Sequence, residues 1–139
     1  MPRWRLTIEY DGAPFVGWQR QDNGPSVQQA IEEAVLKFCG ERAAVAGAGR
    51  TDAGVHAAGQ VAHVDLIRET TPATVRDALN HHLRPAPIAV IEAAAVADDF
   101  HARFSARSRR YRYRILDRPA PPALHRGQVW WTPSALDVP

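Results

Sequence analysis

The strict alternation of apolar and polar side chains from Arg3 to Tyr10 constrains the fold more than any other feature of this sequence. One side of the extended chain carries the apolar residues Trp4, Leu6, Ile8 and Tyr10. A period of two predicts a strand with one face buried and the other face polar. Such a strand needs neighbouring strands for its backbone hydrogen bonds and a second layer over its apolar face.

Two later segments have the apolar spacing of amphipathic helices and can supply that layer. Ser26 is a helix cap, Gln29 completes a capping box, and Gly40 marks the end of a helix of about fourteen residues. Its apolar stripe consists of Val27, Ala30, Ile31, Ala34, Val35 and Phe38. Thr71 followed by Pro72 predicts the start of a second helix, which should end near residue 83 and turn Val75, Ala78, Leu79 and His82 inward.

Four further segments, 42–48, 60–66, 88–97 and 109–116, are predicted as strands because they are apolar or alternate. The predicted order is therefore strand, helix, strand, strand, helix, strand, strand. Hairpin-like strands separated by two crossover helices predict an α+β fold. We expect an antiparallel-rich mixed sheet with both helices packed on one face.

The composition indicates a chain from a reducing, aqueous compartment. Cys39 is the single cysteine among 139 residues, so neither an internal disulfide nor a zinc site of paired cysteines can form. No apolar run approaches the ~18 residues that a membrane span needs. The first residues do not form a secretory signal. We therefore expect a cytoplasmic protein that does not enter a membrane.

Positive charge is concentrated near the end of the chain. The net charge is only +2, but residues up to Asp99 carry 9 basic and 13 acidic side chains. From Phe100 onward there are 8 basic and 2 acidic side chains, and seven of these arginines lie between Arg103 and Arg118. Guanidinium groups bind phosphate oxygens bidentately, so the cluster suggests a polyanionic partner. A solvated strand face rich in arginine is the plainer explanation.

The densest group of chemically active residues lies at 49–57, within the predicted loop 49–59. Arg50, Asp52 and His56 fall within seven residues and are accompanied by Gly49 and Gly54. Glycines allow tight turns and close approach of the backbone to a ligand, and a loop held between strands is a common place for catalytic groups. Alternatively, Asp52 caps a turn and pairs with Arg50. The residues alone leave both explanations open.

A second group extends from residue 98 to residue 114. If 109–116 is a strand, Tyr111 and Tyr113 share one face and Arg110, Arg112 and Arg114 share the other. Rings that stack on a base and arginines that hold phosphates are typical of nucleic-acid binding. The tyrosines could instead be core residues, which we expect for Tyr113.

Three segments resemble the motifs of TruA-type tRNA pseudouridine synthases. Gly-Arg-Thr-Asp-Ala-Gly-Val-His-Ala at 49–57 is similar to the active-site motif of that family. Residues 9–12 with 17–21, and residues 98–106 leading to 110–113, match the other motifs in the same order. The resemblance covers nearly the whole chain. It implies a ferredoxin-like or RRM-like half of a pseudouridine synthase.

The resemblance also implies an activity and a set of site residues. The family isomerises uridine to pseudouridine in the anticodon stem-loop of tRNA, at tRNA positions 38–40, and uses neither metal nor organic cofactor. By match to the motifs, Asp52 is the catalytic carboxylate, Tyr111 stacks on the target uracil, and Arg50 helps to hold the target nucleotide out of its helix. Further candidate RNA contacts are Gln19, Arg20, Arg103, Arg110 and Arg112. Whether the carboxylate first attacks the sugar, attacks the base or removes a ribose proton stays open.

Members of the family are longer and have a second domain that closes the active-site cleft. We therefore expect 1–117 to form the N-terminal catalytic-aspartate domain. Residues 118–139, rich in proline and tryptophan, should lead to a C-terminal domain that this sequence lacks. The isolated chain should fold but turn over tRNA poorly or not at all. The resemblance implies a homodimer for the full-length protein.

Two other functions are compatible with parts of the sequence. A non-catalytic RNA-binding module would use the arginine and tyrosine strand, but it would not need a carboxylate facing a negatively charged backbone. A metal hydrolase could be built on Asp52, His56 and His63. The two histidines are seven residues apart across a predicted loop and strand, with no helix to set the ligand geometry.

Overall fold

The computed structural model describes residues 2–137 of the chain. Its elements are β1 (Arg3–Tyr10), α1 (Val27–Cys39), β2 (Ala46–Gly47), β3 (Ala57–Asp65), α2 (Pro72–Leu83), β4 (Ile88–Val96), β5 (Ile115–Asp117) and β6 (Trp130–Thr132). The chain divides into two compact units, Met1–Arg107 and Ser108–Pro139. No helix of the described residues is long and apolar enough to cross a membrane.

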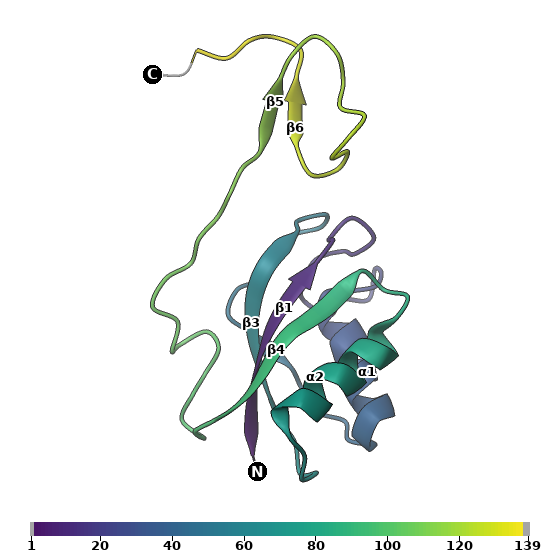
Figure 1. The fold of residues 1–139 in the computed structure, drawn as a ribbon, viewed down its shortest axis with the longest axis vertical. Coiled ribbons are helices and arrows are strands. Elements are labelled where there is room, and N and C mark those ends of the chain that lie inside the picture. The colour runs from purple at the N-terminus through teal and green to yellow at the C-terminus, as the bar shows by residue number, and fades with distance from the viewer. Residues whose placement is uncertain (1, 138–139) are drawn as a thin grey trace. The chain divides into compact units, whose positions relative to one another are not determined.

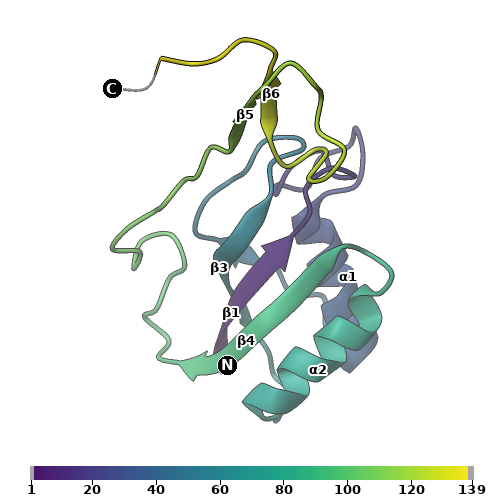
Figure 2. The same ribbon diagram turned by 45° about the horizontal axis from the view of Figure 1, so that its top comes forward.

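The first unit contains a four-stranded antiparallel sheet in the order β2-β3-β1-β4. β1 lies between two partners, so that Arg5 is opposite His63 of β3 and Ala94 of β4. Both helices lie on the same side of this sheet in the two views of Figures 1 and 2. The predicted α+β class, with an antiparallel-rich sheet and two helices on one face, is confirmed.

The apolar side of β1 faces the helices and forms the centre of the core. Trp4, Leu6, Ile8 and Tyr10 are all buried, whereas the residues between them are partly or fully exposed. Helix α1 contributes Val27, Ile31, Ala34 and Val35 to the core, and α2 contributes Val75, Leu79 and Leu83. Burial of these apolar side chains is the main force that holds the two layers together.

The helix starts agree with the predicted caps, with one difference. Ser26 Oγ accepts a hydrogen bond from the Gln29 N–H at 3.1 Å, and Thr71 caps α2, which has Pro72 at its start. The Gln29 side chain, however, donates to Glu33 Oε1 at 3.2 Å. The capping box is thus used in one direction only, because the amide has a carboxylate within reach one turn further on.

The strands around the candidate loop differ from the predicted bounds. Of the predicted strand 42–48 only Ala46–Gly47 forms, because the Val45 N–H donates to Glu32 Oε2 of α1 at 2.9 Å and so belongs to the helix layer. β3 begins three residues before the predicted start at residue 60, since Ala57 pairs with Tyr10 beyond a register shift.

The second unit contains the parallel pair β5 and β6, in which Ile115 is opposite Trp130. The predicted strand 109–116 is wrong over 109–114, where the structure has no strand. Alternation of side chains does not make a strand without a partner for the backbone, and pairing begins only at Ile115. The expectation that Tyr113 is a core residue is also wrong, because its side chain is 85% exposed.

Candidate functional site

The loop that carries Asp52 lies against the loop that follows β1. Gly17 and Asp52 form an isolated antiparallel bridge, and the Trp18 N–H donates to the Thr51 carbonyl oxygen at 3.0 Å. The Val55 N–H donates to the Asp52 carbonyl oxygen at 3.1 Å, which closes a turn just after the aspartate. The backbone on both sides of Asp52 is therefore held by hydrogen bonds.

Two buried aromatic residues support this loop from the core. Trp18 is 1% exposed, and its ring centroid is 6.3 Å from that of Tyr10. The Tyr10 hydroxyl is 2.8 Å from the Thr51 hydroxyl, within hydrogen-bond distance. Burial raises the pKa of Tyr10 above its ordinary value of 10.0, so the phenol stays protonated and can donate.

Gly12 lies directly against the loop that carries Asp52. A Cβ atom at this position would lie 2.0 Å from the Val55 carbonyl oxygen, so no side chain fits. The Gly12 N–H also donates to His56 Nδ1 at 2.9 Å. Gly12 of the motif at 9–12 and His56 of the motif at 49–57 thus belong to one contact surface between the two loops.

The Asp52 side chain itself points into open space. Asp52 is exposed, as are Arg50, Ala53 and Gly54 beside it. No ion pair joins Arg50 to Asp52 among the residues that the structure describes. The explanation of Arg50 as a structural partner of Asp52 therefore finds no support, and both side chains are available to a ligand.

The turn after β4 is anchored to the sheet by His63 of β3, a residue that the sequence analysis did not single out for this role. Its side chain is buried, and its Nδ1 accepts a hydrogen bond from the Ala102 N–H at 3.0 Å. Burial, followed by the nearby positive charges of Arg3 and His101, lowers the pKa of His63. The neutral imidazole that this hydrogen bond needs is thereby favoured.

Arg3 anchors the same turn from β1. Its guanidinium donates to both carboxylate oxygens of Asp65, at 2.8 and 3.0 Å, and also to the Phe100 carbonyl oxygen. The hydrogen bond from Arg3 lowers the pKa of Asp65, which keeps the bidentate pair ionised. Arg3 and Asp65 are directly opposite in the register of β1 and β3. Their positions on the polar side of two alternating segments were the signal that could have found this pair.

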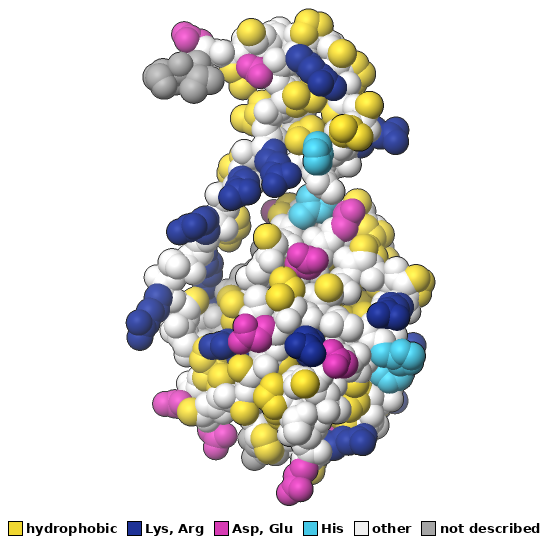
Figure 3. Space-filling view, in the orientation of Figure 1, with side chains coloured by type: hydrophobic (Ala, Val, Ile, Leu, Met, Phe, Trp, Pro, Cys, Tyr) yellow, Lys and Arg dark blue, Asp and Glu magenta, His cyan; other side chains and the backbone are white. Residues whose placement is uncertain are grey.

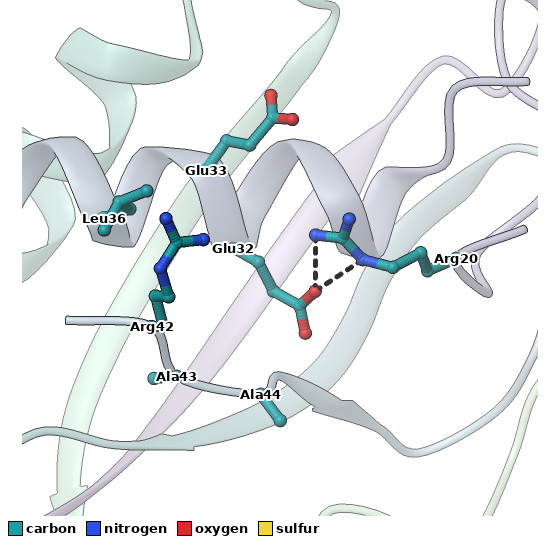
Figure 4. Close-up of a pocket in the computed structure, with 7 residues that line it drawn as sticks. All are labelled: Arg20, Glu32, Glu33, Leu36, Arg42, Ala43 and Ala44. Carbon is teal, nitrogen blue, oxygen red and sulfur yellow. Dashed lines mark hydrogen bonds and ion pairs between the residues drawn. The ribbon is translucent and has the colours of Figure 1, made fainter. Parts of the chain in front are cut away.

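Arg20, a predicted RNA contact, is engaged with helix α1. Its Nε and one terminal nitrogen lie 3.0 and 2.9 Å from Glu32 Oε1, as Figure 4 shows. These two residues line a cavity of about 400 Å³ together with Glu33, Leu36, Arg42, Ala43 and Ala44. The cavity lies between α1 and the segment that follows it, and Asp52 is not among its lining residues. Gln19, next to Arg20, is half-buried.

The other predicted contacts are exposed. Arg103 lies in the first unit, whereas Arg110, Tyr111 and Arg112 lie in the second. Tyr111 is 70% exposed. Basic side chains are spaced along the extended segment that leads to β5, as Figure 3 shows in dark blue.

The residues proposed for a metal hydrolase do not come together as a ligand set. Within residues 2–137, no group of three or more histidine, cysteine, aspartate or glutamate side chains could hold a metal ion. His56 and His63 each use Nδ1 to accept a backbone N–H, from Gly12 and Ala102 respectively.

Residues 6–105 match the family model described as tRNA pseudouridine synthase, and the chain belongs to that family. The resemblance inferred from the motifs is thus confirmed.

Curated relatives agree with this assignment. A protein of Rhodospirillum rubrum is 63% identical over 138 residues, which cover 99% of this chain and 50% of the relative. Proteins of Maricaulis maris and Parvibaculum lavamentivorans are 62% and 60% identical, with 99% of this chain and 55% and 56% of the relative covered. Each is named tRNA pseudouridine synthase A. The chain spans about half the length of these relatives.

Proposed function

We propose that this chain carries the catalytic carboxylate of a tRNA pseudouridine synthase that isomerises uridine in the anticodon stem-loop. The observation that supports the proposal best is the way in which the structure holds the backbone of Asp52 and exposes its side chain. Its backbone is held from both sides, by the bridge to Gly17 and by the turn to Val55, while its side chain is exposed. A rigid backbone with a free acidic group is what a positioned nucleophile or base requires.

The reaction rearranges one nucleoside and needs no other reactant. The bond between ribose C1′ and uracil N1 breaks, the base turns, and C1′ bonds to C5. N1 gains a proton and C5 loses one, so atoms and charge balance. The Asp52 carboxylate can attack the sugar, attack the base or remove a ribose proton. In each route it must be ionised beside the reacting sugar.

Shielding from water would come from outside the described part of this chain, because Asp52 is exposed there. An extruded nucleoside that rests on the 51–56 loop would itself displace water from the carboxylate. The segment by which the relatives exceed this chain could provide a further wall. Both sources of shielding are compatible with a site whose backbone is ordered before the RNA binds and whose walls are completed when it binds.

The energy for extruding the base would come from aromatic and arginine side chains. Removing a paired base from its stack costs a few kcal/mol, and an aromatic platform returns roughly 1–3 kcal/mol. Tyr111 is exposed and free to act as this platform. Arg50 is exposed one residue before Thr51 and can contact the displaced nucleotide. Arg103, Arg110 and Arg112 are exposed arginines that can hold phosphates.

The test joins this chain to the part of the Rhodospirillum rubrum relative that it does not match. An unmodified tRNA transcript is the substrate, and pseudouridine is mapped position by position. Asp52→Asn keeps the size of the side chain, so we expect unchanged tRNA affinity and loss of isomerisation. Asp22→Asn, at another exposed aspartate, is the matched control and should leave turnover unchanged.

The outcomes separate the candidate functions. Isomerisation by the Asp52→Asn protein would refute the proposed role of the carboxylate. Tight tRNA binding without isomerisation by either form would favour the non-catalytic RNA-binding module. Modification outside the anticodon stem-loop would refute the proposed target. The same protein, analysed by sedimentation, tests the proposed homodimer. A tRNA substrate also places the proposed activity in the cytoplasm.

A further inference from the structure

Phe104 is an exposed aromatic ring that lies against two histidine rings in succession. It is 78% exposed, and it is the one large apolar side chain so exposed between residues 97 and 107. Its ring centroid is 4.4 Å from that of His101, with an angle of 31° between the planes. The His101 ring in turn meets the ring of the buried His63 edge to face, with the centroids 4.6 Å apart and 67° between the planes. These two ring contacts connect an exposed ring to the sheet.

The turn that carries Phe104 is held by hydrogen bonds on both sides of the ring. His101 Nδ1 accepts from the N–H groups of Arg103 and Phe104, at 3.1 and 3.3 Å. The Ser105 hydroxyl accepts from the His101 N–H at 2.9 Å, and the Ser105 N–H donates to the His101 carbonyl oxygen at 2.8 Å. Because the turn beneath this exposed ring is already ordered, little conformational entropy is lost when a second ring stacks on Phe104.

Charge beside the ring favours an anionic ligand. The Arg103 guanidinium lies over the Phe104 ring, with its carbon 5.7 Å from the ring centroid, and Arg107 is exposed three residues further on. Asp98 and Asp99 precede the turn and are exposed as well. Arg103 has no carboxylate partner among the described ion pairs, so its guanidinium can turn to a phosphate while the ring accepts a base.

We propose that Phe104 is a stacking platform for an unpaired nucleobase of the RNA substrate, with Arg103 holding the adjacent phosphate. This inference rests on the proposed function. It adds a base-binding position in the first unit to the one proposed at Tyr111 in the second unit. A flat aromatic ring backed by another ring, next to a guanidinium, is typical of sequence-tolerant recognition of single-stranded RNA. A protein partner would be expected to bury a wider apolar surface than one ring.

The test compares the shape of the side chain at 104 while its apolar character is kept. Phe104→Leu removes the ring, and Phe104→Trp keeps one. Binding of an unmodified tRNA transcript to the 139-residue chain is measured by fluorescence anisotropy at several salt concentrations. Ile67→Leu, at another exposed apolar residue of the first unit, is the matched control. Thermal unfolding of each variant shows that the fold is kept.

Loss of one stacked base should weaken binding of Phe104→Leu by roughly 5- to 100-fold. Phe104→Trp should bind within about threefold of the wild type. The dependence on salt should be unchanged for both, since no charge is removed, whereas Arg103→Gln should reduce the slope by about one counterion. RNA substituted with 5-iodouridine should cross-link on irradiation to Phe104 in the wild type.

Two results would overturn the inference. Wild-type affinity of Phe104→Leu would mean that the ring does not stack on the RNA, while the proposed function would stand. Absence of tRNA binding by the wild-type chain would count against the RNA partner itself, and the stacking platform would fall with it.

Discussion

The loop 51–56 and the segment 108–114 both carry groups proposed to contact the substrate, but the chain supports them in opposite ways. Around Asp52 the backbone is held by Gly17, Trp18 and the turn to Val55. Residues 108–114 have no regular secondary structure, and their side chains are exposed. The first region presents its group from a prepared backbone, whereas the second can adapt to the ligand that it meets.

This difference suits two different tasks. A carboxylate that reacts must be placed accurately, and misplacement by about 1 Å can cost 10²-fold in rate. Arginines that neutralise phosphates act over a longer range and tolerate several geometries. We therefore expect small changes beneath the 51–56 loop to alter stability. Changes to Arg110, Tyr111 or Arg112 should alter RNA affinity alone.

Gly12→Ala should have the largest effect on stability. The new Cβ atom would lie 2.0 Å from the Val55 carbonyl oxygen, so the two loops must separate. We expect a loss of about 3 kcal/mol in the free energy of unfolding, measured by urea denaturation. Gly59→Ala is the control, because a Cβ atom there would meet only Thr7 Cγ2 at 4.0 Å. Equal stability of the two variants would show that the loops do not depend on their contact.

The buried His63 predicts a dependence of stability on pH. Burial lowers the pKa of His63 in the folded chain from its ordinary value of 6.5. Below pH 6.5 the unfolded chain binds a proton that the folded chain resists, so the free energy of unfolding falls as pH falls below this value. It is fully restored above it. One proton limits the slope to about 1.4 kcal/mol per pH unit.

The measurement is urea unfolding between about pH 7.5 and 5.5, with His63→Gln as the comparison. The positive charges of Arg3 and His101 disfavour the protonated His63 imidazole, and the negative charge of Asp65 favours it. Asp65 acts in another window. The hydrogen bond from Arg3 lowers its pKa from 3.8, so its contribution is lost only at more acidic pH. A slope that persists unchanged in His63→Gln would assign the effect to other groups.

Tyr10→Phe should have a moderate effect. It removes the hydroxyl that is 2.8 Å from Thr51 Oγ1 and leaves the buried ring in place. We expect a loss of about 1 kcal/mol in the free energy of unfolding. In the joined protein described above, the rate constant for isomerisation should fall more than the affinity for tRNA, since the loop would be less well placed. Thr51→Ser, made in the wild-type chain, keeps the hydroxyl that faces Tyr10 and is the control, which should stay close to the wild type. A fall in affinity alone for Tyr10→Phe would contradict this role.

Tyr111→Ala should have the smallest effect on stability. The side chain is 70% exposed, so the free energy of unfolding should change by less than about 0.5 kcal/mol. Tyr113→Ala, 85% exposed, is the matched control. Both are measured by thermal unfolding, and both are then tested for tRNA binding. Only Tyr111→Ala should weaken binding, and equal weakening by the two variants would argue against a specific platform.

The sequence predicted best what depends on local pattern. The alternation of Arg3–Tyr10 became a strand because β3 and β4 pair with it on both sides. The similar alternation at 109–116 formed a strand only from Ile115 onward, where β6 supplies a partner. The side-chain alternation of one segment does not indicate whether another strand is available to pair with it. Local caps such as Ser26 and Thr71 depend on near neighbours and were predicted correctly.

Contacts between distant segments could not be derived from periodicity. Gly12 lies under Val55, more than forty positions further along the chain. His63 accepts a hydrogen bond from Ala102 across a helix and a strand. The motifs located the 51–56 loop, but its support by Tyr10 and Trp18 emerged only with the fold.

The close contact at Gly12 has a consequence for anyone who wishes to alter this protein. Residues 10–18 and 51–56 fit together without space for a single added methyl group at that point. Grafting either loop alone from a distant homologue would import one half of a matched surface. The two loops should be exchanged as a pair, and libraries for directed evolution should vary them in concert.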